Sequence, residues 1–346
     1  MFQNLLMAVK ANISTIRSII KTNEKIRDIA FGDVSLHKEE TKIVFMNIFQ
    51  DTPKLNDWRV YDHCAVVTRL YAIYETFVED LIRDWLIILQ ELFPSYSDLD
   101  ESIRNTHQNG VGRLLIELKK NRYSHLTVEE VTRGLFYGNT GEGKYELLPD
   151  AFLFHEQNLR KDTLNKLLTD AGVPNTWSWI LKNRYIMHFV KEIRANENSV
   201  ENELDTFISY RNDAAHGTNI DDFLAANALL ELCDFVEALC QALSELVTYQ
   251  VIEKKKLIGQ IQEIGKITEW YQEPKAAILT ANGKDLLSIG DSLFLVGKFY
   301  CQLAKIESIQ SNGESINEIE TTSGMELGLK FDVDARKDLC LYQLTN

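Results

Sequence analysis

Along the first 257 residues, hydrophobic positions recur with the three-to-four-residue spacing of amphipathic helices. The longest such pattern covers residues 58–93, and Pro94 ends it because proline cannot continue a helix. Further helices are predicted within residues 1–50 and at 159–168, 177–193, the stretch before Tyr210, and about 221–256. The pattern therefore predicts a bundle of helices.

Two stretches within this helical part have a less regular pattern. In residues 95–155, Gly110–Leu118 is expected to begin a helix and Gly138–Gly143 to form a loop or turn. Within 177–193, Arg184 and His188 lie one helical turn apart. We interpret that pair as surface decoration rather than as a catalytic site.

After Gly259 the pattern changes to short β-like runs separated by turn-forming residues such as Asn282-Gly283 and Asn312-Gly313. The runs cover residues 264–270, 276–280, 292–296, 302–310, 327–331 and 338–344. Many short strands with regular turns are typical of a small barrel or sandwich. We therefore expect an α + β multidomain chain, with an all-α domain at 1–257 and an all-β barrel at 258–346.

The composition limits which ligands the protein is expected to bind and in which compartment it is expected to act. The net charge of −14 argues against an extended nucleic-acid-binding face, although a small basic cleft remains compatible with it. Five scattered cysteines, with no Cys-x-x-Cys, indicate a reducing compartment, and we expect a cytoplasmic protein without membrane spans. We also expect no metal and no cofactor, because no ligand cluster and no glycine-rich phosphate-binding motif is present.

The best candidate for chemistry is Tyr210–Gly217. Leu204, Phe207 and Ile208 form a helical stripe, and Arg211 continues it where a core residue would be expected. A guanidinium there is costly to bury unless a carboxylate, a phosphate or a wet cavity meets it. His216 follows five residues later, about 140° around an ideal helix and roughly 7.5 Å along it. The two side chains could converge if the helix distorts, or if a second copy supplies the complementary half.

Glu75 lies within the long stripe of residues 58–93. An acid at that place is a candidate partner for Arg211. The alternative is that Glu75 lies at the edge of the stripe and is solvated.

Arg211, the polar Asn212 directly after it and His216 resemble the Arg-x4–6-His motif of the HEPN superfamily. The resemblance covers roughly residues 55–250 and includes 71–85 and 158–173, which are similar to the larger HEPN-like nucleases. It implies a helical domain and a metal-independent endoribonuclease of toxin–antitoxin, CRISPR or phage-defence type. It also implies catalytic roles for Arg211, Asn212 and His216, an RNA substrate, a homodimer with facing motifs, and an antitoxin or other regulatory protein as partner.

The residue chemistry is compatible with this activity. His216 suits proton transfer because its usual pKa lies near neutrality, and Arg211 suits a bidentate grip on phosphate. Two readings stay open, since many HEPN domains are non-catalytic modules that bind a nucleotide, RNA or a protein. In that alternative, Arg211 pairs with Glu75 and His216 caps the helix.

The predicted barrel resembles the second domain of EF-Tu-type translation elongation factors. The matching segments are Ile264–Ile267, Ile289–Asp291, Lys305–Gln310 and Leu327–Lys330. Their glycines and alternating positions are structural, so this resemblance implies a fold and no particular activity.

Overall fold

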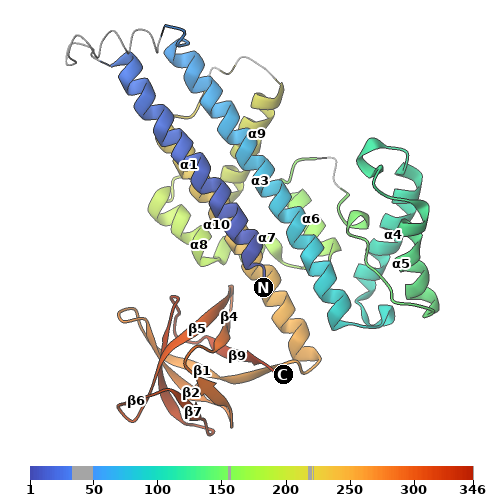
Figure 1. Cartoon of the computed structure of the whole chain (residues 1–346), viewed down its shortest axis with the longest axis vertical. Coiled ribbons are helices and arrows are strands. Elements are labelled where there is room, and N and C mark those ends of the chain that lie inside the picture. The colour runs from blue at the N-terminus through green and yellow to red at the C-terminus, as the bar shows by residue number, and fades with distance from the viewer. Residues whose placement is uncertain (33–49, 155–156, 217–219, 221, 346) are drawn as a thin grey trace.

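The computed structural model describes residues 1–32, 50–154, 157–216, 220 and 222–345. Helices precede strands, as the change of pattern at Gly259 predicts (Figure 1). The α-helices are α1 (Gln3–Phe31), α3 (Leu55–Leu92), α4 (Glu101–Glu117), α5 (Val128–Thr140), α6 (Lys161–Asp170), α7 (Thr176–Lys182), α8 (Arg184–His188), α9 (Val200–His216) and α10 (Ala226–Leu257). The strands are β1 (Ile261–Tyr271), β2 (Ala276–Ala281), β3 (Leu286–Ser288), β4 (Ser292–Gly297), β5 (Tyr300–Ser311), β6 (Glu314–Ile316), β7 (Glu318–Glu320), β8 (Glu326–Phe331) and β9 (Cys340–Leu344). The predicted fold class, a helical domain followed by a β-barrel, is confirmed.

Helix α3 is the central element of the helical domain, and α1, α9 and α10 pack against it (Figure 1). Its hydrophobic stripe is buried along its length, as the pattern predicts. Two polar groups on that stripe bind the backbone of the segment beside it. The Tyr74 hydroxyl donates to the Leu159 carbonyl oxygen at 3.1 Å, and the Trp85 indole nitrogen donates to the Ala171 carbonyl oxygen at 2.7 Å. Helix α3 therefore positions the chain around residues 159–171.

The helix expected to begin at Gly110 begins earlier, at Glu101, and Gly138, expected in a loop or turn, lies inside α5. A Cβ on Gly110, in the middle of α4, would lie 1.9 Å from the Ala151 carbonyl oxygen. A Cβ on Gly138, near the end of α5, would lie 2.8 Å from the ring of Tyr96. These glycines allow close packing rather than a turn, whereas Gly141, with φ of +71°, does end α5.

The single helix expected over residues 177–193 was wrong, because this stretch is divided into shorter helices. Helix α7 ends at Lys182, and the Asn183 side chain then accepts a hydrogen bond from the Tyr185 backbone N–H at 3.0 Å. That bond caps the new helix α8. A π-helical turn, Phe189–Ile193, follows. The break at Asn183 lets Arg184 turn toward α10.

The strands form a closed antiparallel barrel in the order β4-β9-β1-β2-β8-β5, with β5 pairing back to β4. Its interior is a separate hydrophobic cluster that includes Ile264, Leu295 and Phe331. Gly265 lies at a register shift of β1, where a Cβ would approach the Thr280 carbonyl oxygen to 2.4 Å. The alternation of buried and exposed positions along the strands, together with a glycine at the register shift of β1, is consistent with a closed barrel.

The barrel and the helical domain share a core, and Arg184 lies where they meet. Phe294, Val296 and Cys301 of the barrel belong to the same hydrophobic cluster as the helices. The Arg184 guanidinium binds the Glu245 carboxylate at 2.6 and 3.0 Å and lies 3.9 Å from the centre of the Tyr300 ring. The interpretation of Arg184 as surface decoration was therefore wrong, because its charge is paired inside the junction. His188 of the same pair is exposed.

We expect Arg184→Ala to destabilise the protein strongly. The side chain of Glu245 is only 3% exposed, so the variant leaves a buried carboxylate without its cation, which typically costs about 3–5 kcal/mol. The free energy of unfolding in urea measures this loss. The exposed helical pair Lys166–Asp170 provides the control, since Lys166→Ala should change stability by no more than about 0.5 kcal/mol. Similar values for the two variants would contradict the role assigned to Arg184.

Candidate functional site

Helix α9 carries the candidate motif on the face predicted from its stripe. Leu204, Phe207 and Ile208 are fully buried, and Phe207 packs against Tyr71 of α3 with ring centres 6.1 Å apart. Arg211 comes next on that face and is half-buried. Helix α9 ends at His216, which is exposed. Gly217, the last residue of the candidate stretch, and Asp221, near the expected start of the next helix, lie outside the described residues.

The guanidinium of Arg211 lies over an aromatic ring instead of against an acid. Its central carbon is 4.6 Å from the centre of the Tyr71 ring, a cation–π arrangement. Its Nη1 donates to the Oδ1 atom of the neighbouring Asn212 at 3.2 Å. Within the described residues no carboxylate forms an ion pair with Arg211, although Asp162 lines the same cleft.

Asn212 is held in place from a second segment. Asn158 donates from its Nδ2 to the same Oδ1 of Asn212 at 2.8 Å. Because Asn212 Oδ1 accepts from both Arg211 and Asn158, its amide orientation is set by two donors. The Nδ2 group of Asn212 is thereby left to donate elsewhere.

Glu75 and Arg211 both contact Tyr71. The Tyr71 hydroxyl donates to Glu75 Oε1 at 3.0 Å and accepts from the Leu159 backbone N–H at 3.1 Å. Burial, together with the nearby Glu75 carboxylate, raises the pKa of Tyr71 well above its usual value, so the hydroxyl keeps its proton. The direct pair of Glu75 with Arg211 is not formed, and Glu75 is not simply solvated either.

Arg211, Asn212 and His216 line one open cleft of about 500 Å³. Its opposite wall includes Asn158 and Arg160. The separation of Arg211 and His216 around the helix therefore does not prevent both from facing one cleft. Arg160 is less available than Arg211, because its Nη1 binds Asp205 Oδ1 at 2.6 Å.

His63 of α3 holds the chain that leads into α10. Its Nδ1 accepts a hydrogen bond from the Leu224 backbone N–H at 3.1 Å, and its ring meets the edge of the Tyr210 ring at 5.1 Å. The ring is fully buried. Burial lowers the pKa of His63, against the opposing effect of Asp222 and Asp213, so the neutral form is favoured.

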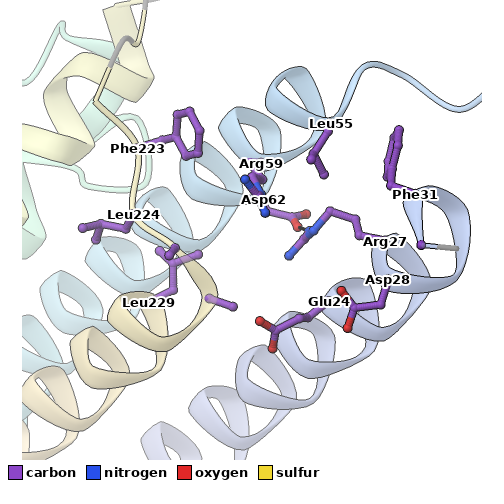
Figure 2. A pocket seen from close by; sticks show the side chains of 13 residues that line it. Glu24, Arg27, Asp28, Phe31, Leu55, Arg59, Asp62, Phe223, Leu224 and Leu229 are labelled. Carbon is purple, nitrogen blue, oxygen red and sulfur yellow. Dashed lines mark hydrogen bonds and ion pairs between the residues drawn. The ribbon is translucent and has the colours of Figure 1, made fainter.

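A second cavity, of about 490 Å³, lies between the end of α1, the start of α3 and the start of α10 (Figure 2). The ion pair of Arg27 and Asp62 is buried in its wall, and Asn23 donates to Asp62 Oδ1 at 2.7 Å. Phe31, Leu55 and Leu229 provide apolar walls (Figure 2). No motif residue lines it, so the buried pair serves to join α1 to α3 rather than to build the motif cleft.

Comparison with protein families identifies the helical part of the chain. The model of a family described as RiboL-PSP-HEPN matches residues 35–249. The chain belongs to this HEPN family. No curated protein and no solved structure gives a significant match. Membership points to a nuclease or nucleotide-related HEPN function, and the match ends before the barrel begins.

Sequence reasoning singled out the candidate motif but missed its neighbours. Tyr71 was counted as a core residue of the α3 stripe, and Asn158 and Arg160 have no periodic pattern that would single them out. Their only signal was that residues 71–85 and 158–173 resemble the larger HEPN-like nucleases. In the described residues no group of three or more histidine, cysteine or acidic side chains is placed to bind a metal, and no helix has the length and apolar character needed to cross a membrane.

A double-mutant cycle tests the link between Glu75 and the HEPN motif. Glu75→Ala and Tyr71→Phe remove the two ends of one hydrogen bond, so their effects on the free energy of unfolding should be non-additive by at least about 0.5 kcal/mol. Thr76→Ala, at an exposed position on the same helix, should be additive with Tyr71→Phe. Strong coupling of Glu75→Ala with Arg211→Ala in a Tyr71→Phe background would show that Glu75 acts on Arg211 without Tyr71.

His63 should make the stability of the HEPN domain depend on pH. The unfolded chain takes up a proton near pH 6.5, whereas the buried ring resists it, so the free energy of unfolding falls as the pH drops below that value. His63→Gln cannot take up this proton and should show a smaller loss between about pH 7.5 and about pH 5.5 in urea titrations. The exposed His188→Gln is the control and should keep the wild-type dependence. Equal pH dependence in all three proteins would exclude this role of His63.

Proposed function

We propose that the protein is a metal-independent endoribonuclease that cuts RNA at the cleft of Arg211, Asn212 and His216. The observation that carries this proposal is the state of Arg211. Its guanidinium reaches an open cleft beside a histidine, and no described carboxylate forms an ion pair with it. A phosphate is a fitting partner for a guanidinium held in this way.

The chemistry needs a base, an acid and a cation. A base takes the proton of the ribose 2′-hydroxyl, and the oxygen attacks the adjacent phosphorus while the bond to the 5′-oxygen breaks. An acid protonates that departing oxygen, which leaves a 2′,3′-cyclic phosphate and a 5′-hydroxyl. His216 is suited to proton transfer, Arg211 to stabilising the charge on the equatorial oxygens, and Asn212 to orienting the phosphate through its Nδ2 group.

One copy of the chain places a single histidine of the motif in its cleft. Since the reaction needs both a base and an acid, we propose a homodimer in which two motifs face each other across a two-fold axis. The exposure of His216 at the end of α9 supports this arrangement, because a partner can reach it.

The setting we propose is a toxin or phage-defence effector that acts in the cytoplasm. An antitoxin or other regulatory protein, which the resemblance to toxin–antitoxin nucleases implies, belongs to the proposal.

A second candidate function is a non-catalytic HEPN module that binds a nucleotide, RNA or a protein. The observation that favours it is that Arg211 and Asn212 also join α9 to α3 and to the segment containing Asn158. In such a module the motif would be retained for structure.

Cleavage of labelled RNA in the presence of EDTA separates these candidates. Arg211→Ala and His216→Ala should each lower the cleavage rate by about 100-fold or more, because each removes one group that acts in the transition state. Replacing the ribose at the cleaved position by 2′-deoxyribose should abolish cutting. The active protein should sediment as a dimer.

His188→Ala provides the matched control, since His188 is an exposed histidine outside the cleft. Its cleavage rate and melting temperature should equal those of the wild type. If Arg211→Ala and His216→Ala unfold the protein, or if the wild type binds RNA without cutting it, the non-catalytic module is the correct reading.

A further inference from the structure

The hairpin between β4 and β5 meets the end of α7 at the junction of barrel and helical domain. Its two-residue turn is Lys298-Phe299, and Phe299 has a positive φ of +59°. The Phe299 ring packs edge-on against Trp179 of α7, with ring centres 5.9 Å apart. The tip of this barrel hairpin is therefore fixed against the helical domain.

Three cations gather around this hairpin. The Nζ of Lys182 lies 4.8 Å from the centre of the Phe299 ring, and the Nζ of Lys298 lies 5.6 Å from it. Arg336 donates from Nη2 to the Lys298 carbonyl oxygen at 2.6 Å, and its guanidinium carbon is 5.3 Å from the Tyr300 ring centre. We call Lys182, Lys298, Phe299 and Arg336 the junction patch.

The charge of the junction patch is not neutralised. All three cations are exposed, and no ion pair joins any of them to a described carboxylate. Two acids of this region are engaged elsewhere, since Asp334 pairs with Lys275 at 3.3 Å and Glu245 pairs with Arg184 inside the junction. By contrast, the barrel lysines Lys284 and Lys330 have acidic partners, each at 2.9 Å.

Uncompensated cations on a chain of net charge −14 are suited to a polyanion. We propose that the junction patch binds the phosphate backbone of single-stranded RNA. Its cations come from three separate elements of the chain, which are α7, the β4–β5 hairpin and the segment before β9. The half-buried Phe299 ring keeps the two lysine side chains in place.

This inference rests on the proposed function in one respect, namely that RNA is the substrate of the motif cleft. The patch and the cleft share no residue. Helices α6 and α9, which line the cleft, belong to the helical domain (Figure 1). The β4–β5 hairpin belongs to the barrel, which is drawn below that domain. An RNA that contacts both sites is therefore longer than the segment that the cleft holds, and the barrel acts as a substrate-binding element.

Binding can be measured apart from cleavage in the full chain carrying His216→Ala. The test variant adds Lys182→Gln, Lys298→Gln and Arg336→Gln. The control variant adds Lys166→Gln, Lys284→Gln and Lys330→Gln, which change the net charge equally at cations that have acidic partners. The affinity for a labelled single-stranded RNA of about 30 nucleotides is then measured as a function of salt.

We expect the patch variant to bind the RNA at least about tenfold more weakly near 0.1 M salt, and to reduce the slope of log affinity against log salt by about 2, from three contacts of about 0.7 each. The control variant should change affinity less than about threefold. Melting temperatures establish whether both variants fold. If the triple patch variant does not fold, the single variant Lys182→Gln replaces it and should show a smaller loss of RNA affinity.

An equal loss of RNA affinity in both variants would overturn the proposal for the junction patch, since the change in net charge alone would explain the loss. So would a patch variant that binds RNA normally but loses binding to phosphatidylserine vesicles or to an acidic protein. Cleavage by the wild type is scored separately. If the wild type does not cut RNA and the patch variant still loses binding, the nuclease proposal fails and the patch stands. If the wild type cuts RNA and the patch variant binds like the control, the patch fails alone.

Discussion

The contact between Arg211 and the Tyr71 ring is the constraint on which the motif cleft depends. A half-buried guanidinium normally acquires a carboxylate, which would cancel its charge. Here an aromatic face and the amide oxygen of Asn212 support it instead. This solution requires Tyr71 to stay protonated, and the burial that raises its pKa ensures that it does. The cleft thus keeps a positive charge that a ligand can use.

The segment around residues 158–160 joins this contact to the rest of the fold. The backbone of Leu159 bonds to two α3 hydroxyls, with its N–H to Tyr71 and its carbonyl oxygen to Tyr74. Asn158 and Arg160 on either side bond to Asn212 and Asp205 of α9. One short segment therefore fixes α9 relative to α3, and the bonds that stabilise the helical domain also position the motif.

Regular packing could be predicted from the sequence, and contacts between remote segments could not. The buried stripes of α3 and α9 and the alternation of the strands follow from local periodicity, which also identified Arg211 as a charge on a core-facing position. Gly138 was misread because a glycine at a close helix contact looks, in sequence, like one at a turn, and Gly110 was taken for the start of a helix that begins at Glu101. Arg184 and Asn158 could not be assigned, because their partners Glu245 and Asn212 are more than fifty residues away.

The distribution of paired and unpaired cations decides where an acidic protein can hold a polyanion. At physiological ionic strength, charges farther away than about 8 Å are largely screened, so the net charge of −14 has little influence at a contact. Arg160 and Arg184 have carboxylate partners and offer little to an added anion. Arg211 and the cations of the junction patch have none among the described residues. An acidic chain can therefore still bind RNA locally, and the affinity should depend on a few positions rather than on the overall charge.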